Sequence, residues 1–261
     1  MMSLIQNKYY IVRVGDFATN GNTKLLYGLF SIVLCIDDYI SRNSTDCGTI
    51  LIGSTVIWTF VEFFLHYSKT RIIKPMYITL WNEKIQLSQN TGIIIQGLQE
   101  GGLVTTLGLY FGDRLFDMYY MIGLHMFILV AIGNICIKKN IIKSSKRQVN
   151  TNMSLSFIGG ITIYNIKSLY QYPEHIYRQL AMFSIMVYIC SFWTFFLWYK
   201  GFRTIEIHIK NTSYAITNTN NSLQPYYKKD ITCSDTFYIL AYDVFFEIGV
   251  AYILFYNLFL I

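Results

Sequence analysis

Apolar residues in this chain are gathered into long blocks that alternate with polar, basic connectors. The blocks cover residues 25–40, 49–66, 92–111, 118–137, 156–170, 179–199 and 237–261. A helix needs about 20 residues to cross a hydrocarbon core of about 30 Å, because each residue adds about 1.5 Å. Five blocks meet or nearly meet that length, whereas 25–40 and 156–170 are short. The pattern predicts an all-α integral membrane protein with about seven transmembrane helices, in which the two short blocks decide the count.

Composition points to the same class. Hydrophobic residues make up 53% of the 261 residues and charged residues 14%, with a mean hydropathy of +0.37. A soluble domain has about 25% charged residues. We therefore expect one polytopic membrane domain over 1–261, with a polar N-terminal segment at 1–24 and its longest connector at 200–235. The net charge of +6 lies in the connectors, so topology explains it and no nucleic-acid partner is expected.

The basic residues predict the orientation of the chain. Cytoplasmic connectors of membrane proteins are enriched in Lys and Arg. With seven crossings and a cytoplasmic N-terminus, the cytoplasmic segments hold all basic residues except Arg42, Arg114, Arg178 and Lys167. We therefore expect the N-terminus and the 200–235 connector in the cytoplasm, and the C-terminus on the outer side.

Two connectors carry further signals. Residues 204–209 alternate apolar and polar, which predicts a short strand or an interfacial segment. Asp113, Arg114 and Asp117 lie in an outer turn and are expected to form a solvated charge cluster. No internal repeat stands out between the first and second halves of the chain.

Several ionisable residues fall inside the apolar blocks. They are Glu62, His66, Glu100, His125, Asp243 and Glu247. A charge at the bilayer centre costs about 2.5–3.5 kcal/mol on insertion scales, so such groups usually face a bundle interior or water. Counting residues from the block ends places Glu100 and His125 near the midplane, and Glu62 and Asp243 nearer the cytoplasm. We therefore predict one inward-opening polar cavity that these side chains line.

Four neighbouring residues support this candidate site, namely Trp58, Gln96, Gly101 and Gly102. Trp58 lies four residues before Glu62, and Gln96 four before Glu100, so each pair shares one helix stripe. The two glycines would let another helix backbone approach closely. The plainer alternative is that Glu62 and His66 form a buried pair that only fixes helix packing, or that the His66 ring lies among headgroups.

Residues 53–67 resemble the first conserved block of the membrane fatty acid hydroxylase and sterol desaturase family. The resemblance rests on a glycine, a Trp-Thr pair, a glutamate, an aromatic residue and a histidine, here Gly53, Trp58, Thr59, Glu62, Phe63 and His66. It implies a helical membrane fold whose metal site faces the cytoplasm. The predicted orientation places His66 on that side.

The rest of the chain departs from that family. The family holds two iron ions with clustered HxxxH and HxxHH boxes, whereas the histidines here are isolated, at His66, His125, His175 and His208. The cysteines show no zinc-type spacing, and no GxSxG, P-loop, HExxH or GxGxxG signature is present. We therefore predict no metal, no cofactor and no catalytic residue, and expect that a relative of this family has lost the oxygen chemistry.

Three functions fit these observations. The first, which we favour, is a lipid-associated, non-catalytic relative of the hydroxylases, with the bilayer and a lipid ligand as partners. The second is a proton- or cation-coupled transporter, because His125 and the intramembrane carboxylates can carry protons. The lack of proline-broken spans and of a visible inverted repeat counts against it. The third is a membrane scaffold in which the buried polar groups only specify helix packing.

Overall fold

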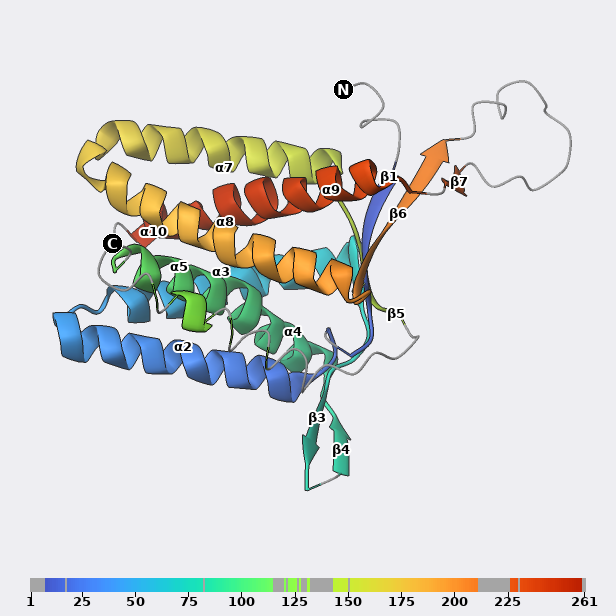
Figure 1. Cartoon of the computed structure of the whole chain (residues 1–261), viewed down its shortest axis with the longest axis horizontal. Coiled ribbons are helices and arrows are strands. Elements are labelled where there is room, and N and C mark those ends of the chain that lie inside the picture. Colours follow the sequence, from blue (N-terminus) through green and yellow to red (C-terminus); the bar gives the residue numbers. More distant parts are fainter. Residues whose placement is uncertain are drawn as a thin grey trace, which may run out of the picture.

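The structure is a computed structural model that describes residues 8–16, 18–81, 83–114, 120, 122–125, 127, 131, 143–149, 151–210, 226–229 and 231–259. The chain is mostly helical, and its helices run side by side along one bundle, with a small β-sheet across one end (Figure 1). Three helices in the described part of the chain are long and apolar enough to cross a membrane. They are Asp46–Tyr67, Pro173–Tyr199 and Cys233–Phe259.

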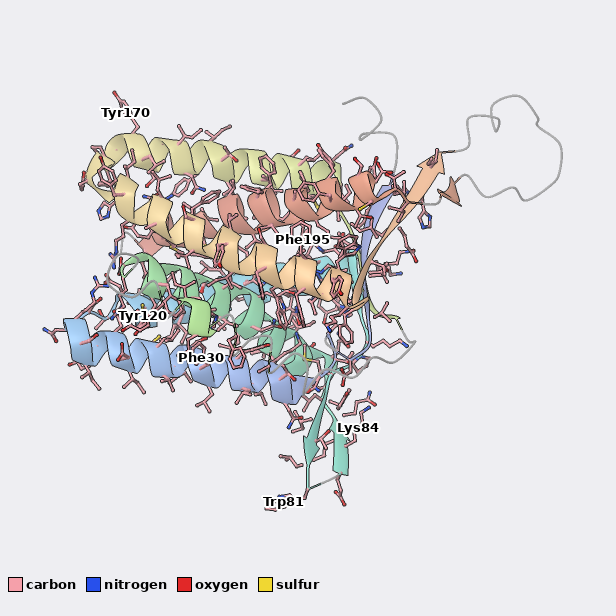
Figure 2. The ribbon with its side chains drawn as sticks, in the orientation of Figure 1. Phe30, Trp81, Lys84, Tyr120, Tyr170 and Phe195 are labelled. Carbon is pink, nitrogen blue, oxygen red and sulfur yellow. The ribbon has the colours of Figure 1, made fainter. Side chains whose placement is uncertain are left out.

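The first half of the chain holds, in order, β1 (Lys8–Val14), α2 (Gly21–Arg42), α3 (Asp46–Tyr67), β2 (Arg71–Ile73), β3 (Tyr77–Leu80), β4 (Glu83–Gln86), α4 (Gln89–Gly97), η1 (Leu98–Leu103) and α5 (Val104–Gly112). The last three form one continuous helix, in which η1 is a π-helical segment. β3 and β4 pair as a hairpin that projects from the bundle, with Trp81 at its tip (Figure 2).

The second half holds β5 (Lys143–Gln148), α7 (Asn152–Gln171), the 3₁₀ turn η2 (Pro173–His175), α8 (Ile176–Tyr199), β6 (Arg203–Lys210), β7 (Tyr226–Lys229), α9 (Cys233–Tyr242), η4 (Asp243–Val250) and α10 (Ala251–Phe259). The last three again form one continuous helix, and η4 is again π-helical. Each of four helices begins directly after a residue whose side chain caps its first turn, and these caps explain where the helices begin. These caps are Asn20, Ser88, Thr151 and Thr232.

The main sheet has five antiparallel strands in the order β2-β5-β1-β6-β7. Its inner face packs on the helix ends, where Ile11 and Ile205 belong to one buried cluster with Ile239 of α9. Its outer face carries polar pairs such as Lys146 with Glu206, at 3.0 Å. We call this end of the bundle the sheet end, and the opposite end the far end.

A buried polar cluster ties helices together at the far end. Asp113, just after α5, accepts hydrogen bonds from Arg42 at 2.6 Å and from Arg178 at 2.7 Å. Its side chain is 4% exposed, and Arg114 beside it is buried as well. The predicted solvated cluster is therefore wrong for these two residues, because cations from other helices neutralise Asp113 inside the protein. Asp117 lies outside the described residues.

Glycines allow η1 to pack closely on α3. A Cβ atom added at Gly101 would lie 2.5 Å from Trp58 Cβ and 2.7 Å from the carbonyl oxygen of Ser54. One added at Gly102 would lie 2.9 Å from a methyl carbon of Leu51. A real side chain does not fit at either position without movement of α3, so the predicted close approach at the two glycines is confirmed.

The predicted fold class is confirmed in its coarse form, since the described chain is mostly helical and three of its helices have the length and composition of membrane spans. Its all-α part is wrong, because the N-terminal segment 1–24 contains β1 and the connector 200–235 contains β6 and β7. The strand predicted at 204–209 is confirmed by β6. The apolar block at 118–137 lies largely outside the described residues.

Candidate functional site

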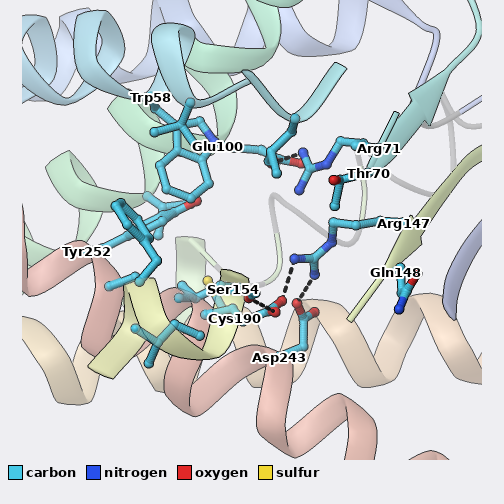
Figure 3. A pocket seen from close by; sticks show the side chains of 18 of the residues that line it. Trp58, Thr70, Arg71, Glu100, Arg147, Gln148, Ser154, Cys190, Asp243 and Tyr252 are labelled. Carbon is cyan, nitrogen blue, oxygen red and sulfur yellow. Dashed lines mark hydrogen bonds and ion pairs between the residues drawn. The ribbon is translucent and has the colours of Figure 1, made fainter. Parts of the chain in front are cut away.

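A cavity of about 570 Å³ lies near the sheet end, between α3 and α7 (Figure 3). Its apolar wall includes Trp58, Phe60, Phe64, Phe157, Trp193 and Tyr252, and its polar floor includes Arg13, Arg71, Arg147, Arg203, Glu100, Asp243 and Glu247. Phe60, Phe64 and Phe157 are 70%, 56% and 54% exposed. The cavity therefore joins a charged floor to an aromatic rim on the outer surface of the bundle.

The arginines of the floor come from four adjacent strands. Arg71 of β2 lies directly opposite Arg147 of β5, and Arg13 of β1 lies directly opposite Arg203 of β6. Arg147 faces Ile11, which is two residues from Arg13. Because side chains alternate between the two faces of a strand, all four arginines lie on one face. The sheet therefore presents a row of guanidinium groups to the helix ends.

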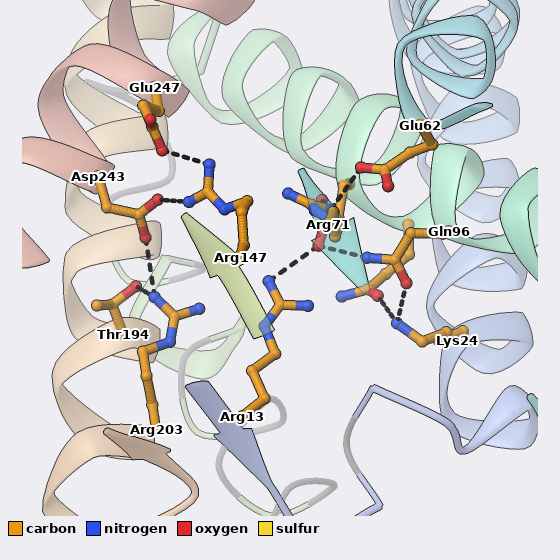
Figure 4. A network of polar contacts seen from close by, with 12 residues as sticks. Arg13, Lys24, Glu62, Arg71, Gln96, Arg147, Thr194, Arg203, Asp243 and Glu247 are labelled. Atoms are coloured by element: carbon orange, nitrogen blue, oxygen red, sulfur yellow. Dashed lines mark hydrogen bonds and ion pairs between the residues drawn. The ribbon is translucent and has the colours of Figure 1, made fainter. Parts of the chain in front are cut away.

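One part of the polar network includes Arg13, Arg71 and Glu62 (Figure 4) and centres on Glu100 of η1. Glu100 accepts hydrogen bonds from Arg13 at 2.9 Å and from Arg71 at 2.6 Å. Arg71 also donates to Glu62 of α3 at 2.5 Å. We call these four residues the Glu100 unit.

The other part centres on Asp243 of η4. Asp243 accepts hydrogen bonds from Arg147 and from Arg203, the latter at 3.0 Å. Arg147 also donates to Glu247, and Arg203 donates to the Thr194 hydroxyl of α8 at 3.0 Å. We call these five residues the Asp243 unit. Each unit thus places one carboxylate between two arginines.

Both central carboxylates lie on π-helical segments, η1 and η4. A π-helical turn holds an extra residue and is found frequently at functional sites. Beside η1, Gln96 donates to Glu100 and accepts a hydrogen bond from the Lys24 ammonium at 2.7 Å. Gln99 accepts from the same ammonium. Amide oxygens therefore hold this buried lysine next to the Glu100 unit.

Charges in the two units balance, with an arginine for every carboxylate. Burial lowers the pKa of Arg71, but the nearby carboxylates of Glu100 and Glu62 outweigh it and hold that pKa above its ordinary value. For Arg203, burial outweighs the attraction of Asp243 and lowers the pKa to about 10. The two arginines differ because Arg71 contacts two carboxylates, whereas Arg203 contacts one carboxylate and one hydroxyl. Both remain charged at neutral pH.

The structure brings four of the six predicted site residues into this network. They are Glu62, Glu100, Asp243 and Glu247. Trp58 lies in the cavity wall against Tyr252, with ring centroids 4.7 Å apart. The carboxylates form no shared cluster with the two imidazoles, because each one is bound by arginine.

The two predicted histidines lie outside the cavity and the network. His66, in the last turn of α3, places its ring 5.5 Å from that of Tyr67. His125 is buried between Phe30 and Phe111, with ring centroids 5.2 and 5.5 Å away. Their assignment to a shared site is therefore wrong. Glu62 binds Arg71 instead of His66, since a guanidinium is always charged and donates from several N–H groups.

Sequence reasoning missed the four arginines that define the floor. It assigned them to cytoplasmic connectors, where the positive-inside rule already accounted for basic residues. The residues before Arg13, Tyr-Tyr-Ile-Val, do not alternate and give no period-two signal. A period-two pattern could have identified Arg203 alone, because it lies two residues before Ile205 and so shares a face with the apolar positions of the alternating stretch 204–209. Such a pattern predicts a half-buried strand with an arginine at the end of its buried face.

No family model, no curated protein and no solved structure matches the chain. Within the part of the chain that the structure describes, no group of three or more His, Cys, Asp or Glu residues could hold a metal ion. The iron site that the hydroxylase resemblance implies therefore has no donor set among those residues.

Proposed function

We propose that the protein is a multi-pass membrane protein that binds a lipid-like amphiphile and catalyses no reaction on it. One observation carries this proposal: the cavity is continuous from a buried, charged floor to exposed aromatic residues on the side of the bundle. An amphiphile has the same two parts, a polar head and an apolar tail. Its head occupies the floor and its tail passes over the rim into the bilayer.

The size and lining of the cavity support this ligand class. Its volume of about 570 Å³ falls within the range of about 300–1,000 Å³ for small-molecule sites. Each methylene group that is removed from water contributes about 0.8 kcal/mol, and the aromatic wall offers such a surface. Entry from the side also suits a molecule that is dissolved in the bilayer rather than in water.

We also propose that the chain crosses the membrane seven times, with the sheet end in the cytoplasm and the C-terminus outside. α5 ends beside the far-end cluster, and β5 lies in the sheet, so in this proposal one further crossing lies between residues 114 and 143. With α2, α3, α4–α5, α7, α8 and α9–α10 this gives seven passages. The basic connectors then lie on the cytoplasmic side.

A non-catalytic relative of the fatty acid hydroxylases is consistent with the contacts of residues 53–67. Glu62, the glutamate of that stretch, forms an ion pair with Arg71 at 2.5 Å. His66 points elsewhere, against Tyr67. In this proposal the stretch builds the cavity wall and anchors the sheet, and it holds no iron.

Lipid retention by the purified protein tests the proposal. Ala251 is buried and lines the cavity, so Ala251→Phe should fill space that the ligand needs. We expect native mass spectrometry to show one retained lipid on the wild type and little on the variant. Gly160→Phe is a matched control, because nothing lies within 4 Å of a Cβ atom added at Gly160 of α7. Equal retention by wild type and Ala251→Phe would contradict the proposal.

Proton- or cation-coupled transport is the second candidate, favoured by the concentration of buried carboxylates around Glu100 and Asp243. Proteoliposomes with an imposed pH or cation gradient distinguish it from lipid binding alone. A flux that Glu100→Gln abolishes would support transport, and no flux above that of empty vesicles would remove it. A scaffold without a ligand would show neither flux nor retained lipid.

A further inference from the structure

The order of elements in the first half of the chain recurs in the second. β1, α2, α3 and β2 are followed, after the β3–β4 hairpin, by the helix α4-η1-α5 (Figure 1). β5, α7, α8 and β6 are followed, after β7, by the helix α9-η4-α10, and both helices contain a π-helical segment. In the sheet order β2-β5-β1-β6, a two-fold axis through the middle of the antiparallel β1–β5 pair exchanges β1 with β5 and β2 with β6. The topology is therefore that of two copies of one unit.

The strand register supports the same exchange at the level of single residues. Arg13 pairs directly with Arg203, and Arg147 pairs directly with Arg71. Exchanging β1 with β5 and β6 with β2 converts the first pair into the second. The opposed arginine pairs on either side of the axis are therefore equivalent.

Residues 57–73 and 189–205 also match without a gap when they are offset by 132 residues. Identical positions are Ile57 and Ile189, Phe60 and Phe192, Phe63 and Phe195, Phe64 and Phe196, Leu65 and Leu197, Tyr67 and Tyr199, Arg71 and Arg203, and Ile73 and Ile205. At the same offset, Lys69 and Gly201 both have left-handed backbones, with φ of 57° and 75°. The expectation that the halves show no repeat is therefore wrong.

Contacts inside the site obey the same symmetry. Arg71 donates to Glu62 and Arg203 donates to Thr194, in each case to the residue nine positions earlier. Glu62 and Thr194 are themselves 132 residues apart. Glu100 lies between Arg13 and Arg71, as Asp243 lies between Arg147 and Arg203. The Glu100 unit and the Asp243 unit are thus two versions of one half-site.

We infer that the chain is an internal duplication and that its two half-sites together bind the oxygen-rich anionic headgroup of a lipid, through the equivalent arginines Arg71 and Arg203. This inference rests on the proposed lipid binding and names the chemistry of the head. Both arginines line the cavity and are 4% and 5% exposed. The Nε donor of each has no acceptor within the described residues.

The atoms that lack partners identify the class of ligand. Among the residues that line the cavity, these atoms are buried donors, namely Nε of Arg71, Nε of Arg203 and the indole nitrogen of Trp58. No carboxylate oxygen of the network is among the buried atoms that lack a partner in the described chain. Buried donors need acceptors, and guanidinium groups suit phosphate and carboxylate oxygens. A phosphate-bearing head satisfies both arginines, whereas an uncharged polar head offers no charge to them.

Headgroup competition tests the inference on the full chain. Native mass spectrometry in mixed micelles compares dioleoyl phosphatidic acid with dioleoylglycerol, which has the same tails and an uncharged hydroxyl head. We expect the wild type to prefer phosphatidic acid by about tenfold, the ratio that corresponds to about 1.4 kcal/mol. Equal binding of the two lipids would overturn the anionic assignment, and this measurement requires no variant. Addition of millimolar inorganic phosphate distinguishes a lipid headgroup from free phosphate as the ligand. Displacement of the lipid by phosphate alone would show that the free anion suffices for binding.

Two conservative variants test whether the half-sites are equivalent. Arg71→Lys and Arg203→Lys each keep the positive charge beside the carboxylates but remove the Nε donor. We expect each to lower the preference for phosphatidic acid to a similar degree, with Arg42→Lys at the far end as the control. If one variant lost the preference for phosphatidic acid and the other kept it, the proposed pairing of the two half-sites would be overturned. The wild type could also retain lipid without any headgroup preference, while Ala251→Phe still abolishes the retention. That result would refute this inference alone and leave the proposed function intact.

Discussion

Single arginines determine the chemistry of the floor. A buried carboxylate without a partner is costly, and removing one partner of a buried ion pair costs about 3–5 kcal/mol. Each acid here is held by a guanidinium that reaches it from a strand, as Arg71 reaches both Glu62 and Glu100. The sheet therefore stabilises charges that the helices alone would leave unbalanced, and it fixes the positions of the donors that face the cavity.

Asp113 provides a residue-scale prediction at the far end. Burial raises its pKa, but the hydrogen bonds from Arg178 and Arg42 outweigh this and hold the pKa below its usual value. The ionised form is therefore favoured by folding. Asp113→Asn should lower the free energy of unfolding by about 1.5–3 kcal/mol at neutral pH, the contribution of hydrogen bonds to charged groups. Thermal unfolding of the purified protein in detergent measures this.

The pH dependence of that loss follows from the sign of the shift. An acid whose folded pKa is lowered adds stability above its unfolded pKa of about 3.9, and this stability disappears as the pH falls through the folded pKa. The gap between wild type and Asp113→Asn should therefore close in strong acid. Glu174→Gln is the control, since that side chain is 65% exposed. A gap that widens on acidification would contradict the assigned role.

At this scale the sequence predicted the acids but not their partners. Glu62, Glu100, Asp243 and Glu247 could be identified because a charge within an apolar block is conspicuous. Arginines at strand ends are not conspicuous, since basic connectors occur in every membrane protein. The histidines were misassigned for a related reason: spacing along a helix shows that Glu62 and His66 share a stripe, but not that a strand from a distant segment supplies a stronger partner.

Among the elements, the contact of α3 with η1 connects the network to the bundle. Gly101 and Gly102 follow Glu100 directly, so the backbone that carries the central carboxylate lies against the α3 segment that carries Trp58. A shift of either helix would move Glu100 relative to Arg71. Packing and ion pairing are therefore coupled at this point.

Substitution of Gly101 gives an element-scale prediction. A Cβ atom there would lie 2.5 Å from Trp58 Cβ, closer than real Cβ atoms approach. Gly101→Ala should destabilise the protein by about 1–3 kcal/mol, the usual cost of overpacking. Gly159→Ala is the matched control, because an added Cβ meets nothing within 4 Å at that position. Unchanged thermal stability of Gly101→Ala, measured beside this control, would show that the two helices are not held at this distance.

The sheet shows where sequence-based prediction of elements fails. Helices of about 20 apolar residues leave a strong signal, and three of them have the character of membrane spans in the structure. β2 has three residues and β7 has four, too few for a period to be visible. The strands also come from widely separated segments, so their pairing depends on contacts that no local pattern records. β6, with eight residues, was long enough for its alternation to be detected.

For the whole molecule, orientation is the first property to test. Cys233 is exposed at the start of α9 near the sheet, and Tyr170 is 89% exposed at the far end of α7 (Figure 2). If the sheet end is cytoplasmic, an impermeant maleimide should label Tyr170→Cys in intact cells and label Cys233 only after permeabilisation. The label that appears only after permeabilisation should be absent from Cys233→Ser, which identifies Cys233 as its site. Labelling of Cys233 in intact cells would reverse the proposed topology.

The duplication predicts that a polar group can be moved from one half of the molecule to the other. Glu62 and Thr194 occupy equivalent positions, and both side chains are buried. Glu62→Thr removes one of the two acids that Arg71 binds, and Thr194→Glu places a glutamate beside Asp243, so each change alone should be destabilising. The double variant restores the balance, because the equivalent Arg203 can bind the new glutamate as Arg71 binds Glu62.

A double-mutant cycle measures this exchange. We expect the double variant to be more stable than the sum of the single effects by about 0.5–3 kcal/mol, the range for coupled residues, in thermal or denaturant unfolding. Glu62→Thr combined with Asp113→Asn is the control, because Asp113 lies in the far-end cluster and its effect should add. If Glu62→Thr and Thr194→Glu were equally additive, the two positions would not share one network. The symmetry in their contacts would then carry no energetic meaning, although the repeat in the fold would remain.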